Sequence, residues 1–262
     1  MKFKREFEKY RGFIFDMDGT TYRGTRIIPK ADTTVNYIKS TGRKVLFVAN
    51  KTTGTTTEYH AFLKQNGLNI LETEILTATK VIKKYISNNF FDFPFFALGE
   101  DKFIEELRDE GLTYSADPLR IRIVIVTLDR TLNYEKLEIA ARALETGAKF
   151  LAANIDDTCP VDNGEILDAG STISALEKRT HRKLELHFGK PSRFMFDEAI
   201  KQIGLPANEI LLLGDRIETD IKMGNLFGVD TALVQTGVKS NFADYKDIAP
   251  DYILNSIADI II

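Results

Sequence analysis

The chain has 262 residues, of which 44% are hydrophobic and 28% are charged, and its formal net charge is −3. These values are typical of a globular protein with one large domain or two modest ones. Lysine and arginine are spread along the chain, which argues against a nucleic-acid polymer as a partner. The single cysteine excludes an internal disulfide, and no apolar run reaches membrane-spanning length. We therefore expect a cytoplasmic protein that does not contact a membrane.

The first predicted element is a buried strand that ends in two carboxylates. Residues 12–16 form an apolar run that leads into Asp16, Asp18 and Gly19. Residues two apart point to the same side of an extended chain, so both carboxylates can face one point beyond the strand. Such a pair predicts a bound hard metal ion or a raised pKa. A strand followed by an ordinary Asp-Gly turn explains this stretch alone equally well.

Strands and helices alternate along the rest of the chain, which predicts a doubly wound parallel sheet. From about residue 75 the alternation restarts, and periodicity does not separate an inserted domain from further strands of one sheet. The expected helices lie near residues 30–41, 56–63, 81–86, 103–107, 134–144, 171–176 and 194–200. The expected strands after the first lie near residues 44–50, 93–99, 121–126, 149–153, 184–188, 209–215, 231–234 and 252–254.

Polar residues follow four of these strands. The carboxyl ends of parallel strands meet at one edge of a sheet, where ligands bind in folds of this kind. Several carboxylates, one lysine and free backbone amides suit a Mg²⁺-assisted reaction on a phosphate, because cations reduce repulsion between the groups that react. The residues concerned are Asp16 with Asp18, Asn50, Lys190, and Asp215 with Asp220.

Residues 16–20 (Asp-Met-Asp-Gly-Thr), 189–191 (Gly-Lys-Pro) and 214–220 resemble motifs I, III and IV of the haloacid dehalogenase superfamily. More narrowly, the chain is similar to the NagD-like, p-nitrophenyl phosphatase branch. This resemblance implies a Rossmann-like doubly wound parallel sheet core over residues 1–77 and 182–262, with an inserted α/β cap domain over residues 78–181. Further stretches that resemble the cap of this branch are residues 128–130, 133–137, 153–156 and 169–171.

The resemblance also implies roles for particular residues. Asp16 would be the nucleophile that forms an aspartyl-phosphate, and Asp18 would be the general acid and base. Mg²⁺ would be held by the Asp16 carboxylate, the Asp18 backbone carbonyl and the Asp215 carboxylate, with Asp220 supporting these ligands. Lys190 would neutralise the phosphoryl oxygens and the nucleophile.

One position departs from the family pattern. Where motif II has a Thr or Ser hydroxyl at the end of the second strand, this chain has Ala49, followed by Asn50. Alanine cannot donate a side-chain hydrogen bond to a phosphoryl group, although the backbone N–H of Asn50 can. Loss of one such bond costs on the order of 1.5–3 kcal/mol. We therefore expect a slowed phosphatase.

The expected activity is Mg²⁺-dependent hydrolysis of small phosphomonoesters, such as nucleotides, sugar phosphates or p-nitrophenyl phosphate. Asn154 and Asp156 are the candidates for contacts with the leaving group, although they fit equally well as residues that shape the turn after their strand. Two alternatives stay open: a phosphometabolite-binding or regulatory protein with negligible turnover, which Ala49 favours, and a receiver domain, which is about half this length. Homodimers that form through the cap occur in this branch, but no sequence feature marks such an interface here.

Overall fold

The computed structural model describes residues 1–161, 164–238, 245 and 247–262. The chain divides into two compact units. We call residues 1–49, 56–76 and 190–262 the core unit, and residues 50–55 and 77–189 the inserted unit. This division differs from the predicted boundaries at residues 50–55, 77 and 182–189, which lie in the inserted unit.

A six-stranded sheet forms the centre of the core unit, in the order β14-β13-β12-β1-β4-β5. The described registers are parallel, and they place Phe15 of β1 opposite Leu213 of β12 and Phe47 of β4. All five residues of β1 are buried, as the apolar run predicts. The strands are β1 (Gly12–Asp16), β4 (Lys44–Ala49), β5 (Ile75–Thr77), β12 (Ile210–Gly214), β13 (Asp230–Val234) and β14 (Tyr252–Leu254), with a small hairpin of β2 (Tyr22–Arg23) and β3 (Arg26–Ile27) after β1.

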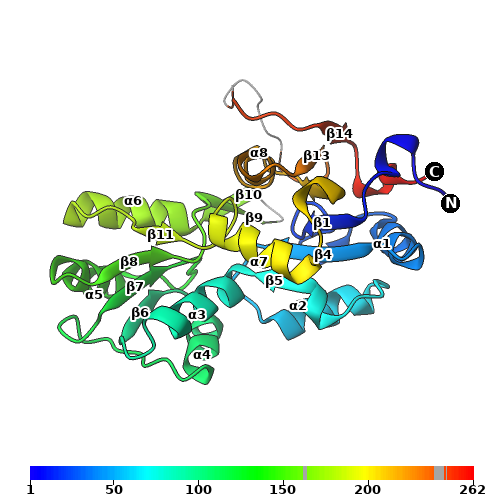
Figure 1. Ribbon diagram of the computed structural model, residues 1–262. Helices are drawn as coiled ribbons and strands as arrows, with labels where there is room; N and C mark the ends of the chain where they lie inside the picture. Colours follow the sequence, from blue (N-terminus) through cyan, green and yellow to red (C-terminus); the bar gives the residue numbers. More distant parts are fainter. Residues whose placement is uncertain (162–163, 239–244, 246) are drawn as a thin grey trace. The chain divides into compact units, whose positions relative to one another are not determined.

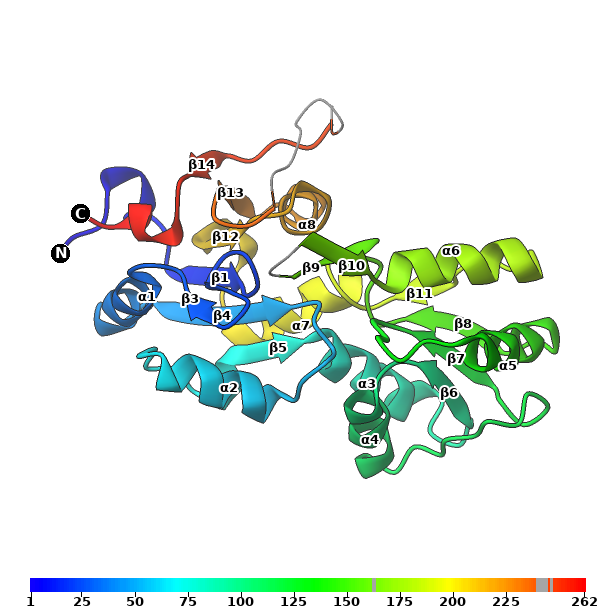
Figure 2. The same ribbon diagram turned by 180° about the vertical axis from the view of Figure 1, so that it is seen from behind.

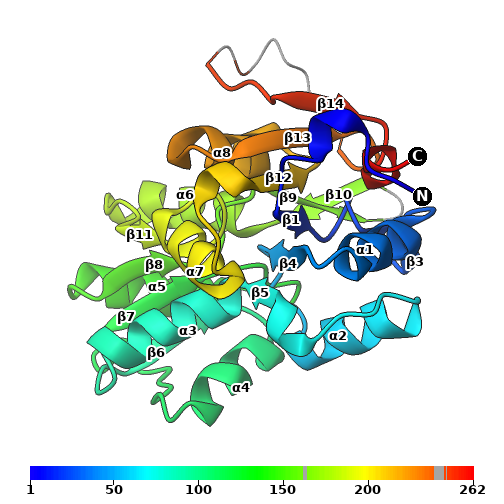
Figure 3. The ribbon, with the colours of Figure 1, turned by 45° about the vertical axis from the view of Figure 1, so that its right-hand side comes forward.

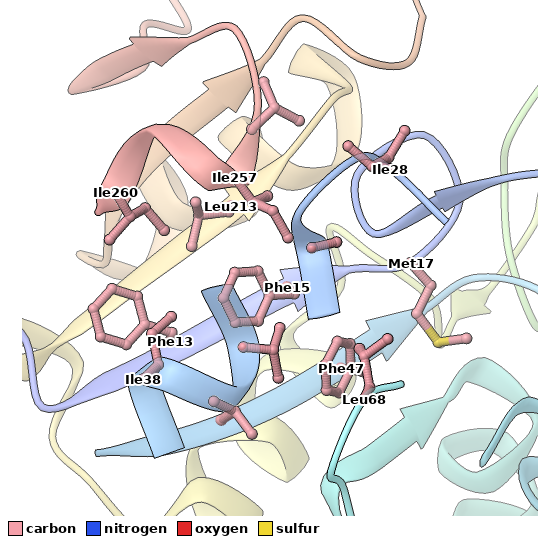
Figure 4. Close-up of a cluster of buried hydrophobic side chains, with 14 of the residues drawn as sticks. Phe13, Phe15, Met17, Ile28, Ile38, Phe47, Leu68, Leu213, Ile257 and Ile260 are labelled. Atoms are coloured by element: carbon pink, nitrogen blue, oxygen red, sulfur yellow. The ribbon is translucent and has the colours of Figure 1, made fainter. Parts of the chain in front are cut away.

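Helices cover both faces of this sheet (Figures 1 and 2). One face packs against α1 (Ala31–Ser40), α2 (Thr56–Gln65) and the 3₁₀ turn Ile257–Ile260. Figure 4 shows the apolar cluster on this face, where Phe13, Phe15, Phe47 and Leu213 from the strands meet Ile38 of α1 and Ile260. The other face carries α7 (Arg193–Ile203) and α8 (Lys222–Phe227), whose rings Phe196 and Phe227 stack.

The inserted unit has a parallel sheet of its own, in the order β11-β8-β7-β6. Alternate strand residues, among them Val124, Val126 and Phe150, pack against α5 and α6, and α3 lies on the other face (Figure 3). The elements are α3 (Ala78–Asn89), β6 (Phe95–Leu98), α4 (Asp101–Asp109), β7 (Ile123–Val126), α5 (Tyr134–Glu145), β8 (Lys149–Ala152), β9 (Thr158–Val161), β10 (Gly164–Leu167), α6 (Ala169–Thr180) and β11 (Leu186–His187).

Side-chain caps explain where several helices begin. Asn133 accepts a hydrogen bond from the Lys136 N–H at the start of α5, and Ser192 accepts one from the Met195 N–H at the start of α7. Such caps satisfy amides that have no partner within the helix. Helix α7 ends at Gly204, which has a positive φ of 62°.

The predicted fold class is confirmed, because strands of a parallel sheet alternate with helices on both faces. The structure also decides the question that periodicity leaves open, since β6, β7, β8 and β11 form a second sheet rather than extending the first. Within the described residues, no helix has the length and apolar character needed to cross a bilayer.

Candidate active site

The carboxylate of Asp16 stands at the carboxyl end of the central strand of the core unit. Asp16 is the last residue of β1, and its side chain is buried. The next residue, Met17, points into the apolar cluster (Figure 4). The Thr21 hydroxyl donates to the Asp16 carbonyl at 2.8 Å, which fixes the turn that follows the strand. Asp18 lies in this turn and is half-buried.

A buried ammonium group lies between two carboxylates. Lys190 Nζ donates to Asp16 Oδ1 at 2.5 Å and to Asp220 Oδ1 at 2.6 Å. Only 2% of Lys190 is exposed. Burial by itself lowers the pKa of Lys190, but the charges of Asp16 and Asp220 outweigh burial and raise this pKa. Lys190 therefore stays protonated and offsets part of the negative charge around it.

Asp220 reaches this position from a π-helical turn, Ile217–Ile221, between β12 and α8. Its second oxygen, Oδ2, accepts from the Arg216 N–H at 3.2 Å. Both oxygens of Asp220 thus have protein donors, as expected of a residue that supports metal ligands without binding the ion itself. Burial raises the pKa of Asp220 to about 6, although Lys190 lowers it.

The third carboxylate of the cluster is Asp215, directly after β12. One ligand atom each from Asp16, Asp215 and Asp220 lies within 4.8 Å of the others. Burial raises the pKa of Asp215 well above its usual value, and the charges of Asp16 and Asp220 add to this effect. The pKa of Asp16 is also raised, chiefly by burial, although Lys190 lowers it.

These residues fit a Mg²⁺ ion. Asp16 Oδ2 is buried and has no hydrogen-bond partner within the described part of the chain, which is costly for a carboxylate oxygen unless a cation or a proton is bound. Three carboxylates against one ammonium also leave surplus negative charge. The carboxylate of Asp18 is not part of the cluster; the expected ligand of that residue, its backbone carbonyl, stays a prediction.

Sequence reasoning missed residues 236–238, which follow β13. The Thr236 hydroxyl donates to the Gly19 carbonyl at 2.6 Å, and the Val238 N–H donates to Asp215 Oδ2 at 2.8 Å. The segment therefore touches two of the motifs at the carboxyl edge of the sheet. The signal in the sequence was the Thr-Gly-Val stretch that follows a predicted closing strand. It did not indicate the contacts with Gly19 and Asp215, because these residues lie far away in the sequence.

The remaining candidates meet in the inserted unit. Asn154 is 2% exposed. Its Nδ2 donates to Asp156 Oδ2 at 3.0 Å and to Asp168 Oδ1 at 2.9 Å, and its Oδ1 accepts from the Thr127 hydroxyl at 3.0 Å. Asn50 Nδ2 donates to the same oxygen of Asp156 at 2.9 Å.

The segment that begins at Asn50 is hydrogen-bonded to this network, which is centred on Asn154, at two points. The first is the bond from Asn50 to Asp156, and the second involves Thr52. The hydroxyls of Thr52 and Thr127 are hydrogen-bonded at 2.5 Å. Asp168 also accepts from the Ala169 N–H at the start of α6. Ala49, the last residue of β4 and directly before Asn50, is buried.

Two family models match the chain. Residues 13–113 match a model described as haloacid dehalogenase-like hydrolase, and residues 187–260 match a second model of HAD-like hydrolases. Among curated proteins, the sugar-phosphatase AraL of Bacillus subtilis is 31% identical over 95% of this chain and 91% of its own length. The 5'-nucleotidase YutF of the same organism is also 31% identical, over 87% of this chain and 88% of its own.

Solved structures of similar proteins have the same fold over nearly their whole length. A p-nitrophenyl phosphatase from Archaeoglobus fulgidus is 32% identical and superposes with a TM-score of 0.89 over 96% of this chain and 98% of its own. A 4-nitrophenylphosphatase from Thermotoga maritima is 26% identical, with a TM-score of 0.90 over 98% of both chains.

Proposed function

Because the chain belongs to the haloacid dehalogenase superfamily and is a phosphomonoester hydrolase of its NagD-like, p-nitrophenyl phosphatase branch, we propose that it hydrolyses small phosphomonoesters with Mg²⁺ through an aspartyl-phosphate on Asp16. The observation that carries this proposal is the state of the Asp16 carboxylate. Its Oδ1 is held by Lys190 and its Oδ2 is buried without a partner in the described residues. It is therefore oriented and incompletely neutralised.

In the first step, an oxygen of Asp16 attacks phosphorus and the bond from phosphorus to the ester oxygen breaks. Asp18 donates a proton to the leaving oxygen. In the second step, Asp18 removes a proton from water, which attacks the phosphoryl group and releases phosphate and free Asp16. Dividing one displacement into two lowers each barrier.

Lys190 counters the negative charge of both partners in the first step. Its ammonium already contacts Asp16 and is fixed from the other side by Asp220, so little reorganisation is needed when phosphate enters. A bound Mg²⁺ would supply further charge neutralisation for the phosphoryl oxygens. The residues that would hold it are Asp16, Asp215 and the backbone carbonyl of Asp18, with Asp220 in support.

The named relatives, a sugar phosphatase and a 5'-nucleotidase among them, support this substrate class. We propose that the inserted unit, predicted as a cap over residues 78–181, contacts the leaving group. Asn154 and Asp156 stay predictions for that contact. The carboxamide of Asn154 already donates and accepts within the inserted unit, which favours a supporting role for this residue.

Ala49 favours a second candidate function. Without a hydroxyl at this position, the protein would bind a phosphorylated metabolite and turn it over negligibly, as a binding or regulatory protein. The contacts of Lys190 with Asp16 and Asp220 support the enzyme instead, because pure binding does not require a nucleophile to be oriented.

Phosphate release from a panel of sugar phosphates, nucleoside monophosphates and p-nitrophenyl phosphate tests the proposal. We expect turnover by the native protein with Mg²⁺, none after chelation, and none in Asp16→Asn. Asp197→Asn, on the exposed surface of α7, is the matched control and should retain turnover. Phosphate binding without turnover in the folded, Mg²⁺-loaded native protein would establish the binding function and overturn the enzymatic one.

A further inference from the structure

Residues 236–238, here called the 236–238 segment, connect two parts of the candidate active site that are far apart in sequence. The Thr236 hydroxyl donates to the carbonyl of Gly19, in the turn that carries Asp18. Two residues later, the Val238 N–H donates to Oδ2 of Asp215. One short segment therefore holds both the turn after β1 and the carboxylate after β12.

The Asp215 carboxylate is also enclosed by two glycines. A Cβ at Gly237 would overlap its oxygen and would lie 2.7 Å from its Cβ, and a Cβ at Gly19 would lie 2.7 Å from its Cγ. Gly19 has a φ of +91°, so its backbone favours glycine in any case. Gly237 does not have a positive φ of this kind. At position 237, glycine is therefore required by the space that Asp215 occupies.

We propose that the 236–238 segment is a positioning element that sets the orientation of the Asp215 carboxylate and thereby the affinity of the site for Mg²⁺. This inference rests on the proposed function, in which Asp215 is a ligand. The hydrogen bond from Val238 fixes Oδ2, and the carboxylate fills the space that a Cβ at Gly19 or at Gly237 would need. A ligand that is already oriented does not have to be ordered when the ion binds, which strengthens binding.

Calorimetric titration of metal-free protein with MgCl₂ measures this effect without any substrate. We expect Gly237→Ala to weaken Mg²⁺ binding by about 10- to 100-fold, the range for residues that orient metal ligands. Thr236→Val should weaken binding less, because it removes only the bond to Gly19, and Thr236→Ser should restore native affinity. If the hydroxyl of Thr236 had a structural role alone, Thr236→Val would be less stable than Thr236→Ser but would keep native affinity for Mg²⁺.

Gly224→Ala is the matched control for crowding. A Cβ at Gly224 would overlap the methyl group of Thr231, to a degree similar to the overlap at Gly237, but it would meet no carboxylate. This variant should lose stability and keep native Mg²⁺ affinity. Circular dichroism and thermal melting of each variant establish that it is folded before titration.

Native affinity in folded Gly237→Ala would overturn the inference. If Gly237→Ala does not fold, the Thr236 pair decides, and native affinity in Thr236→Val overturns it. The proposed function fails separately: a native protein that binds Mg²⁺ but releases no phosphate contradicts the enzyme and leaves the role of the segment standing. A native protein that binds no Mg²⁺ contradicts both.

Discussion

The charged cluster of the core unit and the network centred on Asn154 in the inserted unit are both buried, but they differ in how their polar atoms are satisfied. In the core unit, three carboxylates form a cluster, the ammonium of Lys190 contacts two of them, and Asp16 Oδ2 has no donor among the described residues. In the inserted unit, a neutral carboxamide, Asn154, is the centre, and each of its polar atoms has a partner. The first cluster leaves a carboxylate oxygen without a donor in the described residues, whereas the carboxamide at the centre of the second has a partner for each of its polar atoms.

The difference indicates which cluster is made for a ligand. Burial raises the pKa values of Asp16, Asp215 and Asp220, which means that the ionised cluster is unfavourable in the metal-free protein. A cation relieves that cost. The Asn154 carboxamide has no comparable cost to relieve, because each of its polar atoms already has a partner. We therefore assign chemistry to the first cluster and positioning to the second.

The largest expected effect is the loss of the ammonium in Lys190→Met. Removing one partner of a buried ion pair costs about 3–5 kcal/mol, here because Asp16 and Asp220 lose their shared donor. Urea unfolding at pH 7 in the presence of chelator measures the loss of free energy of unfolding, and phosphate release should disappear as well. The double variant with Asp220→Asn should recover part of the stability. If Lys190→Met alone is as stable as the native protein, the cluster is not held by this pairing.

The next effect is a pH dependence of the metal-free protein. The pKa of Asp220 in the folded state is about 6, against an ordinary value of 3.8, so between these values the folded state binds more protons than the unfolded state. The free energy of unfolding should therefore fall as pH rises from 4 to 7, by at most roughly 3 kcal/mol for this group. Unfolding in urea across this range, with and without Mg²⁺, measures the slope.

Asp220→Asn isolates this contribution, because other carboxylates titrate in the same range. The difference in free energy of unfolding between native protein and variant should change with pH in chelator and become flat with saturating Mg²⁺. A difference that stays constant with pH in chelator would contradict the raised pKa of Asp220.

A smaller effect is expected in the second cluster. Asn154→Leu keeps the approximate volume but leaves Thr127, Asp156 and Asp168 each without one partner, at a cost of about 1–3 kcal/mol. Because the proposed Mg²⁺ ligands belong to the other cluster, the affinity for Mg²⁺ should not change. Asn66→Leu, on the surface after α2, serves as the control for the same exchange. A weakened Mg²⁺ affinity in Asn154→Leu would remove the distinction between the clusters.

The smallest effect concerns the junction between the units, where Ala49 ends β4 and Asn50 begins the segment tied to Asp156. Ala49→Thr should raise the turnover number about 10-fold, with an upper limit near 150-fold if the whole hydrogen bond acts in the transition state. Steady-state kinetics with p-nitrophenyl phosphate measures this. Ala49→Val, which has the same shape without the hydroxyl, should not raise turnover; equal gains in both variants would point to packing instead.

The sequence was sufficient to predict a strand and the residue at its end where the hydrophobic pattern is local. The apolar runs before Asp16 and Asp215 predict strands that end in carboxylates, and β1 and β12 deliver these residues as expected. The hairpin of β9 and β10 was not predicted, because its four-residue strands have no clear alternation and are mostly exposed where described. Short strands of this kind depend on their partner rather than on their own pattern.

The residue types that form the charged cluster can be predicted from the sequence. The contacts between their atoms can be read only from the folded structure. Asp16 and Asp215 stand at the carboxyl ends of β1 and β12, which are neighbours in the core sheet, so their convergence follows from a parallel sheet. The prediction that Lys190 follows a strand of this same sheet was wrong, because β11, the strand before it, belongs to the sheet of the inserted unit. Which oxygen Lys190 contacts, and which oxygen of Asp16 is left without a donor in the described residues, depends on the packing of neighbouring strands.

Tertiary structure alone decided the contacts that orient these groups. Thr236 and Gly19 are 217 positions apart, and nothing in either stretch indicates the other. The same holds for Asn154, which the sequence places after a strand. Its partners Thr127, Asp156 and Asp168 lie directly after β7, in the turn after β8 and directly before α6. Periodicity reports which face of an element is buried, whereas a hydrogen bond or an overlap with a carboxylate requires the positions of atoms brought together by the whole fold.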